Sequence, residues 1–451
     1  MNAEQRRKAI RRRRIFLAVC TAILILLISL IAWGVSAIFR ADKPKDTTKN
    51  KDAVGSASSE QEPVHLLSSA TVLNTGDILI HNPVLDGAKS GDTYDFSAFF
   101  PLIKPYVQAA DLSVINLEVT LGGTQAGSYK GYPAFNTPDV LVDELLSTGF
   151  QMVLTANNHS YDTGLYGMKR TVQVLKEKKM AYIGTRETAE EPNFVIRNVN
   201  GVKIGMACFT YENVCETPGR KSLNGNIIAE EANSLINSFA YERIDSFYTE
   251  AQNIVREMEK GGADAIVFYM HWGNEYKLKE DTWQQTIAQK LCNMGVDVIV
   301  GSHPHVVEPM ALLHAEDSEN TTVCLYSMGN SISNQRREEL GNLSPNGHTE
   351  DGVLFSYTFD RYSDGTTVLS CVDAIPTWVN KYRGGSGWQY QMIPLENPND
   401  GSAKYGLTGT AAQKAAASFA HTKELLSEGL RACQTAIGCP VRFAAEGEVS
   451  P

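Results

Sequence analysis

The sequence of 451 residues predicts a layered α/β domain preceded by one N-terminal transmembrane helix. Three observations lead to this prediction. Short apolar runs alternate with segments of helical spacing, several of these runs end in Asp, Glu, Asn or His, and a charge-free stretch lies near the N-terminus. Such alternation is typical of domains in which helices cover a β-sheet. The chain is also long enough to bury a full hydrophobic core.

The first 65 residues divide into three segments of different composition. Residues 1–14 hold seven cations and one acid, and residues 15–39 carry no charge. Because about 20 apolar residues suffice to span a bilayer, we expect a transmembrane helix at 15–39, behind a basic cytoplasmic arm at 1–14. Residues 40–65 are mostly polar and are predicted to be a flexible linker.

A cleaved signal peptide is the competing interpretation of this segment, because Val35-Ser36-Ala37 resembles a cleavage site. The apolar part of a signal peptide is usually about 7–15 residues long, which favours an uncleaved anchor. We therefore expect a single-pass protein of the cell membrane, with its N-terminus in the cytoplasm and its C-terminal domain outside.

Four segments with helical spacing are each followed by an apolar strand. The helices are expected at 138–148, 167–179, 245–260 and 281–294, and the strands at 152–155, 181–183, 265–270 and 296–300. Later runs lack long helices between them and predict a second, more antiparallel sheet packed on the first, with strands at 322–326, 352–359, 366–375 and 389–393. The α/β domain is assigned to residues 66–395, and residues 396–451 to an Ala-rich helix at 410–432 and a polar tail.

The charge balance argues against nucleic acid as a partner. The whole chain has a net charge of −10, and the basic N-terminal arm means that the rest of the chain is more acidic still. An acidic domain repels polyanions in general, so an anionic substrate would need a local device such as bound metal ions.

Seven of the eight cysteines lie outside the predicted membrane span. The pairs Cys208/Cys215 and Cys433/Cys439 are close enough in sequence to form disulfides, and both alternatives stay open. No Cys-x-x-Cys spacing is present, which argues against a structural zinc ribbon.

The most informative motif is Gly301-Ser302-His303-Pro304-His305, at the end of the apolar strand 296–300. In open α/β sheets, ligands bind at the carboxyl ends of the strands. Two imidazoles separated by one proline are suited to hold one metal ion or two adjacent ions.

Other apolar runs end in the same kinds of side chain. Each has an ordinary interpretation when taken alone, as a helix cap, a turn residue or a buried core histidine. Their joint occurrence at the ends of separate strands predicts one shared site. The residues concerned are Asp77, Glu118, Asn158, His159, His271, Glu275 and Asn330.

Taken in order, these motifs closely resemble those of the bacterial CapA family, which is associated with capsule and poly-γ-glutamate synthesis. The resemblance covers about residues 69–378. It rests on the motifs Gly76-Asp77, Asn116-Leu117-Glu118, Asn157-Asn158-His159, His271-Trp272-Gly273-x-Glu275-Tyr276, Gly301-Ser302-His303-Pro304-His305 and Ser327-Met328-Gly329-Asn330.

The CapA family in turn resembles the calcineurin-like metallophosphoesterases. That resemblance implies a four-layer α/β/β/α sandwich with two divalent metal ions, Mn, Fe or Zn, at the strand ends. Glu118 stands where that pattern has a bridging aspartate, and Leu79 stands where it has a histidine two residues after the first aspartate. The metal ligands implied are Asp77, Glu118, Asn158, His271, His303 and His305.

The same resemblance implies that His159 is the catalytic acid or a phosphate-contacting residue. Glu275 is a second candidate catalytic residue, which contacts substrate or orients His271. Pocket walls are expected from the polar loops at 128–138, 211–216 and 335–347.

The expected function is that of a metal-dependent hydrolase in capsule or poly-γ-glutamate biosynthesis, acting on a phosphoester or an analogous bond in a surface polymer. The alternative is a non-catalytic subunit that handles or exports the polymer, with metal binding its carboxylates. Expected partners are other membrane components of polyglutamate synthesis and an anionic polymer or phosphoester substrate.

Overall fold

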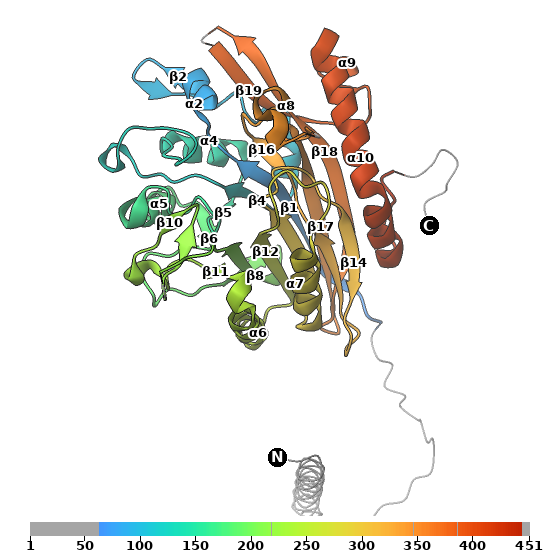
Figure 1. Cartoon of the computed structure of the whole chain (residues 1–451). Helices are drawn as coiled ribbons and strands as arrows, with labels where there is room; N and C mark the ends of the chain where they lie inside the picture. Colours follow the sequence, from blue (N-terminus) through green and yellow to red (C-terminus); the bar gives the residue numbers. More distant parts are fainter. Residues whose placement is uncertain (1–62, 218, 346, 386, 444–451) are drawn as a thin grey trace, which may run out of the picture. The chain divides into compact units, whose positions relative to one another are not determined.

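The computed structural model describes residues 63–217, 219–345, 347–385 and 387–443, and from Pro63 onward these form one compact unit (Figure 1). The predicted arm at 1–14 and membrane span at 15–39 lie outside the described residues, as does most of the predicted linker. In the described part of the chain, no helix is both long and apolar enough to cross a membrane.

The fold is mixed α/β, as the alternating pattern predicts, and it is built on two large sheets. The first sheet has eight strands in the order β19-β18-β17-β1-β4-β5-β6, with β16 paired to β1. One half is parallel: β1 (Leu66–Ile78), β4 (Leu112–Leu117), β5 (Met152–Leu154), β6 (Ala181–Ile183) and β16 (Asn330–Ile332). The other half is antiparallel: β17 (Asp351–Tyr362), β18 (Thr367–Gly384) and β19 (Gly387–Pro394).

The second sheet has seven strands in the order β11-β8-β12-β13-β15-β14, with β7 paired to β8. Five strands run parallel: β8 (Val202–Tyr211), β11 (Ser238–Phe239), β12 (Ala265–His271), β13 (Val298–Ser302) and β15 (Thr321–Leu325). Two strands run antiparallel to their neighbours: β7 (Val195–Val199) and β14 (Met310–His314).

The prediction of a separate, more antiparallel second sheet was wrong. The antiparallel strands β17, β18 and β19 continue the first sheet beyond β1, and the second sheet is mainly parallel. The strand predicted at 322–326, observed as β15, belongs to the second sheet and lies parallel to β13. An alternating apolar pattern identifies a strand but does not show which distant strand it pairs with. Pairing depends on which other strand edges are available in the folded protein.

The helices predicted between strands are present with small shifts at their ends. They are α4 (Val140–Thr148), α5 (Gly164–Glu177), α6 (Ile244–Lys260) and α7 (Thr282–Asn293). Asp281 and Gln284 form a capping box that sets the start of α7, each side chain bonding the other residue's backbone N–H. The shorter elements are α2 (Asn82–Ala88), α3 (Lys104–Ala109), α8 (Arg337–Leu340), α9 (Asp400–Ala403), β2 (Lys89–Ser90), β3 (Thr93–Tyr94), β9 (Ser222–Leu223) and β10 (Asn226–Ile227).

Apolar side chains place these elements in layers. Residues of both sheets, such as Val72, Phe355 and Val267, form one buried cluster between the sheets. A second cluster packs α2, α3, α4 and α5 on the outer face of the first sheet, and a third packs α6 and α7 on the outer face of the second. Two facing sheets with helices outside bury both faces of each sheet, which explains the nearly continuous apolar strands.

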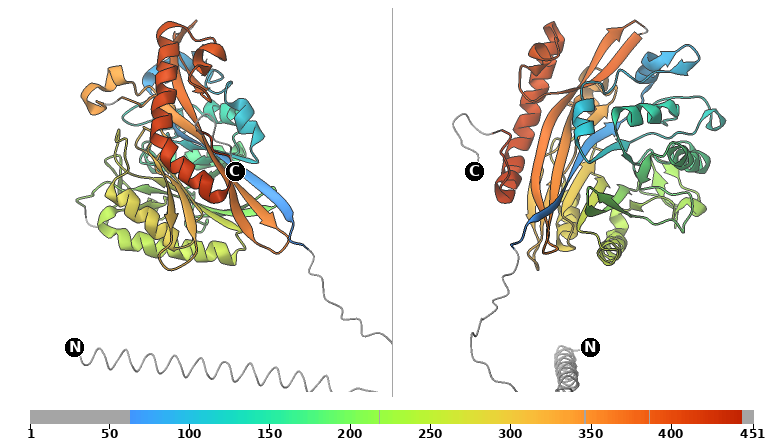
Figure 2. Two further views of the ribbon diagram at one scale, coloured as in Figure 1. Left: turned by 90° about the vertical axis from the view of Figure 1, so that its right-hand side faces the viewer. Right: turned by 180° about the vertical axis from the view of Figure 1, so that it is seen from behind.

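The long C-terminal helix α10 (Gly409–Ile437) covers one side of the paired sheets, next to β18 and β14 (Figures 1 and 2). Its residues Leu426, Leu430 and Cys433 are fully buried in the cluster between the sheets. The helix is therefore part of the core, although the sequence pattern shows only an Ala-rich segment.

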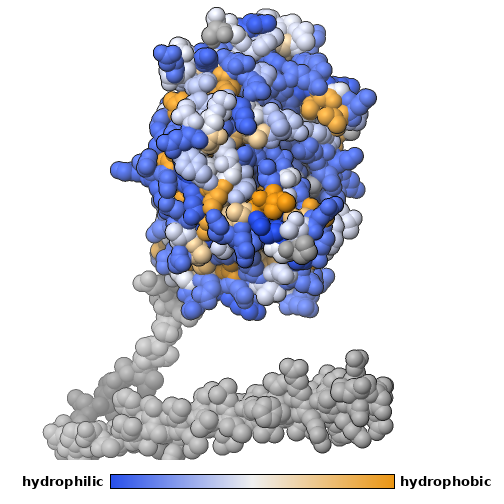
Figure 3. All heavy atoms as spheres, turned by 60° about the vertical axis from the view of Figure 1, so that its left-hand side comes forward, coloured by the Kyte–Doolittle hydropathy of each residue, from blue (hydrophilic) through white to orange (hydrophobic). Residues whose placement is uncertain are grey.

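The two disulfides left open by the sequence are not formed. Cys208, Cys215, Cys433 and Cys439 are all free, as are the other cysteines of the described residues. The surface seen in Figure 3 is largely hydrophilic, with small, separate hydrophobic groups, as expected of an acidic globular domain.

Candidate metal centre

Side chains from the ends of five strands converge at one end of the two sheets. Asp77 is the last residue but one of β1, Glu118 follows β4, and Asn158 and His159 follow β5. From the second sheet, His271 ends β12, and His303 and His305 follow β13. The exposure of each of these seven side chains lies between 0% and 4%, so they form a buried polar cluster.

Asp77 connects the first sheet to the histidine loop of the second. Its Oδ2 lies 3.1 Å from Nδ1 of His305 and accepts the backbone N–H of His303 at 3.2 Å. Its Oδ1 accepts a hydrogen bond from Nδ2 of Asn116 at 2.7 Å. Burial would raise the pKa of Asp77, but the contacts with His305, His271 and Asn116 outweigh burial and lower it, so the carboxylate is charged.

Glu118 is the central residue of the cluster. Its Oε1 lies 3.4 Å from Nε2 of His271 and 3.8 Å from Nε2 of His305. Among the described residues neither of its two oxygens has a hydrogen-bond partner, and the same holds for Nδ1 of His303. Burial, and then the charges of Asp77 and Glu275, raise the pKa of Glu118 well above its usual range. Burying a carboxylate without a partner is costly, so these free atoms fit a bound cation.

Three groups of metal-ligating atoms lie at this end of the sheets, and two of them share Glu118. Asp77, Glu118 and His305 have ligand atoms within 4.8 Å of one another, and so do Glu118, His271 and His303. A carboxylate common to two ligand sets is the arrangement that a bridging residue between two ions requires. The geometry therefore agrees with the bridging position that the sequence pattern implies for Glu118.

His271 is held from both of its ring nitrogens. Nε2 lies 2.9 Å from Oδ1 of Asn158, and Nδ1 lies 3.0 Å from Oγ of Ser302. Burial lowers the pKa of His271 to about 3 and that of His303 well below its usual range. Both imidazoles are therefore neutral, which is the form that binds metal ions.

His159 is oriented by a carboxylate that the sequence analysis did not single out. Its Nδ1 lies 2.7 Å from Oδ2 of Asp162, and Nδ2 of Asn224 lies 3.3 Å from the same nitrogen. The ring of Phe135 stands edge-on to the imidazole at 4.8 Å. A carboxylate on one ring nitrogen fixes the tautomer and leaves the other nitrogen for chemistry.

Glu275 belongs to the cluster but not as a partner of His271. Its carboxylate lies within 4.8 Å of the ligand atoms of His303 and His305, and it is the exposed member of the group. The orienting contact to His271 comes from Ser302 instead. Glu275 thus stands at the solvent side of the buried cluster.

Close backbone approach is built into this end of the sheets. A Cβ on Gly76 would lie 1.8 Å from the carbonyl oxygen of Gly329, and the backbone N–H of Asp77 donates to that oxygen at 3.0 Å. His303 and His305 have positive φ angles of 98° and 57°. Residues held in such sparsely populated conformations cluster at functional sites, where the surrounding structure enforces them.

Several contributing residues were missed or only partly recognised from sequence. Asn116 and Ser302 lie inside the quoted motifs, and Asp162 lies three residues after His159, so a search for hydrogen-bonding side chains near each ligand would have found them. Tyr211 packs its ring 4.7 Å from that of His303. His81 lies outside both ligand sets, and its Nδ1 accepts the backbone N–H of Asn334 at 3.3 Å.

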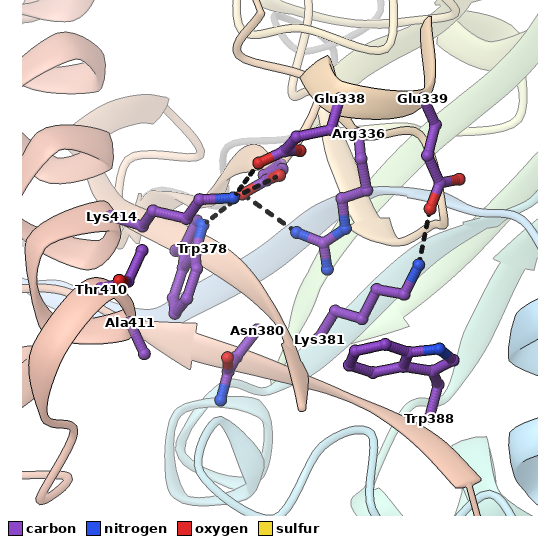
Figure 4. Close-up of a pocket in the computed structure, with 11 residues that line it drawn as sticks. Arg336, Glu338, Glu339, Trp378, Asn380, Lys381, Trp388, Thr410, Ala411 and Lys414 are labelled. Atoms are coloured by element: carbon purple, nitrogen blue, oxygen red, sulfur yellow. Dashed lines mark hydrogen bonds and ion pairs between the residues drawn. The ribbon is translucent and has the colours of Figure 1, made fainter. Parts of the chain in front are cut away.

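The predicted pocket walls are present only in part. Phe135, Tyr211 and Gln335 touch residues of the cluster, the last through a 2.9 Å hydrogen bond to Asn330. Arg336 instead points to a separate cavity of about 390 Å³ and donates to the carbonyl oxygen of Val379. Figure 4 shows that cavity, which is also lined by Trp378, Asn380, Lys381 and Lys414.

The fold and the site together define a mixed α/β protein with a buried histidine and carboxylate cluster shared by two sheets. Residues 71–335 match the family described as "Bacterial capsule synthesis protein PGA_cap", and this range contains all six predicted ligands, His159 and Glu275. The chain belongs to that family, which confirms the resemblance found in its motifs.

Curated relatives agree with this assignment. The capsule biosynthesis protein CapA of Bacillus anthracis is 26% identical over 312 residues, covering 67% of this chain and 66% of that protein, slightly less than two thirds. The PGA biosynthesis protein CapA of Bacillus subtilis (strain 168) is 27% identical over 292 residues, covering 63% of this chain and 68% of that protein. A solved structure, TT1561 of Thermus thermophilus, covers 63% of this chain and 93% of its own at 10% identity, with a TM-score of 0.29, too low to establish a common fold.

Proposed function

We propose that this protein is a metal-dependent hydrolase of the metallophosphoesterase type that acts in capsule or poly-γ-glutamate biosynthesis. The observation that carries the proposal is the pair of ligand sets joined by Glu118, whose two buried oxygens lack a hydrogen-bond partner among the described residues. Two facing sheets with outer helices agree with the four-layer arrangement of that enzyme class.

Two divalent ions, such as Mn, Fe or Zn, would fit this donor set. One ion would be held by Asp77 and His305. The other would be held by His271, His303 and Asn158, and Glu118 would contribute to both. When bound, such ions stabilise the charge on a phosphoryl oxygen and generate a hydroxide nucleophile near neutral pH. The mixed oxygen and nitrogen donors suit these metals better than calcium or magnesium, which prefer oxygen alone.

The remaining roles belong to the side chains around the ligands. His159, whose Nδ1 lies 2.7 Å from Oδ2 of Asp162, would donate a proton to the leaving group from its second ring nitrogen. Glu275, exposed beside His303 and His305, would position the incoming substrate or its attacking water. The ring of Tyr211 packs against that of His303, with centroids 4.7 Å apart, and would shield that side of the cluster.

The cellular role proposed here rests on family membership. The relatives are named for capsule and PGA biosynthesis, so a phosphoester or analogous bond in an anionic surface polymer or its precursor is the proposed substrate. We further propose that residues 15–39 anchor the protein in the cell membrane, with the catalytic unit outside and other membrane components of polyglutamate synthesis as partners.

A substrate panel tests the enzymatic proposal. Wild-type protein and His159→Ala are loaded with Mn, Fe or Zn and offered phosphomonoesters, phosphodiesters and poly-γ-glutamate. We expect turnover of at least one class by the wild type and a loss of at least about 100-fold in the variant, as is typical of removing a general acid. Unchanged turnover in the variant would refute the role of His159, and a protein that takes up no metal would refute the metal centre.

A polymer-handling subunit without catalysis is the second candidate. It is favoured by Leu79, which is 1% exposed and stands where the related enzymes have a histidine ligand. With fewer ligands on the side of Asp77, the ion there would be bound more weakly. The centre could then bind carboxylates of a polymer without catalysing hydrolysis. Polymer binding that survives His159→Ala, with no turnover of any substrate, is the result that selects this candidate.

A further inference from the structure

A second cluster of metal-ligating side chains lies apart from the centre described above. It consists of His348, in the loop before β17, Asp351, the first residue of β17, and His421, on α10. Their ligand atoms lie within 4.8 Å of one another, and none of the three belongs to the ligand sets that contain Glu118. The cluster therefore joins two segments of the chain, the stretch from His348 to Asp351 and the helix α10, which lies 70 residues beyond Asp351 at His421.

The two imidazoles converge on one carboxylate oxygen. Nδ1 of His348 and Nδ1 of His421 each lie 3.1 Å from Oδ2 of Asp351. The two rings are stacked, with centroids 3.2 Å apart and an angle of 11° between their planes. Asp351 is 3% exposed, so its charge is largely removed from water and needs compensation from these two neighbours.

We propose that His348, Asp351 and His421 form a binding site for one zinc ion, or for a similar divalent ion that prefers imidazole, and that this ion fastens α10 to β17. Two imidazoles and one carboxylate are a common ligand set of such ions. Ligands at about 2.1 Å from a tetrahedral ion lie about 3.4 Å apart, which is near the nitrogen to oxygen distances of 3.1 Å found here.

The exposure of the three side chains also fits a site with one open position. The side chain of His348 is 30% exposed and that of His421 is 17% exposed, whereas that of Asp351 is 4% exposed. Water can therefore complete the coordination from the solvent side, while the carboxylate anchors the ion from within. No substrate cavity is needed for such a site.

The backbone at His348 agrees with a binding role. Its φ angle of 72° is positive, a conformation that is uncommon for residues other than glycine. His303 and His305 share this property at the first centre. In each case the surrounding structure holds a histidine in an unfavourable conformation that directs its ring into a cluster of ligands.

The position of the site gives it a structural consequence. The neighbouring residue Glu350 already contacts α10 through Lys414, at 3.7 Å, and accepts a hydrogen bond from Trp378 at 3.0 Å. His421 lies about two turns further along the same helix. An ion at this point would strengthen the existing contact between His421 of α10 and Asp351 at the start of β17, and so would hold the C-terminal helix more firmly.

Zinc alone is the probe for this proposal, which does not depend on the proposed function. Full-length protein is stripped with a chelator and titrated with zinc, and bound zinc is counted. We expect His348→Gln/His421→Gln to bind one equivalent less than the wild type. His314→Gln, which changes an exposed histidine of β14, is the matched control and should bind as the wild type does.

Hydrogen exchange of α10 supplies a second readout. Zinc should slow exchange of the α10 amides in the wild type and in His314→Gln, but not in the double variant. If the double variant does not fold, His421→Gln alone keeps a side chain that can bond to Asp351, and it should weaken zinc binding at one site at least tenfold. Equal zinc stoichiometry and equal exchange in wild type and variants would overturn the proposal and leave a hydrogen-bonded cluster without metal.

Discussion

Oδ2 of Asp77 lies 3.1 Å from Nδ1 of His305, although 228 residues separate the two in the chain. The contact joins the end of β1 in the first sheet to the loop after β13 in the second. Because the two residues come from different sheets, the candidate centre exists only when the sheets are packed face to face. The candidate centre therefore depends on the packing of the core between the sheets as well as on the ligand side chains.

Replacement of this carboxylate should weaken metal binding. Asp77→Asn keeps the shape of the side chain but removes its negative charge, which would balance the charge of a cation. The same carboxylate contacts the backbone N–H of His303 and Nδ1 of His305. We expect manganese affinity at the first centre to fall at least tenfold, since even outer partners of metal ligands contribute about 10–100-fold. Calorimetric titration of the chelator-treated protein measures the change.

The matched control is Asp86→Asn, which removes an exposed carboxylate of α2. Its manganese binding should equal that of the wild type. A variant Asp77→Asn that binds manganese as tightly as the wild type would show that Asp77 is not a ligand.

The carboxylate behind His159 should affect turnover but not metal content. Asp162→Asn removes the negative charge that lies 2.7 Å from Nδ1 of His159. The imidazole of His159 is then less strongly held in one tautomer. We expect kcat to fall about 10–100-fold while bound metal stays unchanged, since Asp162 lies outside both ligand sets. Steady-state kinetics together with metal analysis separates the two effects.

Asp92→Asn, at an exposed position between β2 and β3, serves as the control and should leave kcat unchanged. A parallel loss of metal and turnover in Asp162→Asn would contradict the assigned role, because it would make Asp162 part of the ligand system.

Glu308 should make stability depend on pH. It is fully buried, Nε2 of Gln284 donates to its Oε2 at 2.7 Å, and Oε1 has no partner among the described residues. Burial raises its pKa from 4.5 to about 8. Between these pH values the folded protein holds a proton that the unfolded chain releases, so this residue destabilises the fold as pH rises from 4.5 to 8.

Glu308→Gln mimics the protonated form at every pH and should remove that contribution. We expect its Tm to exceed that of the wild type by several degrees at about pH 8 and to approach it near about pH 4.5. Thermal unfolding of both proteins across this range provides the measurement. Curves that run parallel over the whole range would contradict the raised pKa.

The docking of α10 should contribute strongly to stability. Leu426 is fully buried in the cluster between the two sheets, so Leu426→Ala leaves a cavity there. We expect a loss of about 2–5 kcal/mol in the free energy of unfolding. Urea denaturation followed by circular dichroism measures it, provided that unfolding is two-state.

Glu424→Ala, at an exposed position two residues earlier on the same helix, is the control. It should change the free energy of unfolding by no more than about 0.5 kcal/mol. Similar losses in both variants would mean that α10 is stabilised by its own helicity and not by packing on the sheets.

Much of the local structure follows from sequence patterns. The helix predicted at 245–260 is observed as α6 at Ile244–Lys260, and the strand predicted at 265–270 is observed as β12 at Ala265–His271. The predicted ligands also come together, because the carboxyl ends of parallel strands meet at one edge of a sheet. The helix and strand predictions succeed because they depend on neighbouring residues only, and the convergence of the candidate ligands follows from the parallel strand order.

The predictions that failed concern pairing over long distances. The separate antiparallel sheet was wrong because β17 pairs with β1, which lies at the other end of the described chain, and no local pattern specifies that partner. The loop at 335–347 was expected to line the pocket, but its Arg336 turns to Glu350 and the carbonyl oxygen of Val379. A loop's position in sequence does not fix the direction of its side chains.

The sequence by itself determined the mixed α/β class, the family and the candidate ligands at the strand ends, because periodicity and motif spacing are local properties. Only the tertiary structure decided that two sheets share the centre and that Glu118 belongs to both ligand sets. It also brought His421 on α10 to Asp351, 70 residues earlier in the chain. The physical reason is that long-range contacts depend on how the sheets and helices pack, which no short stretch of sequence encodes.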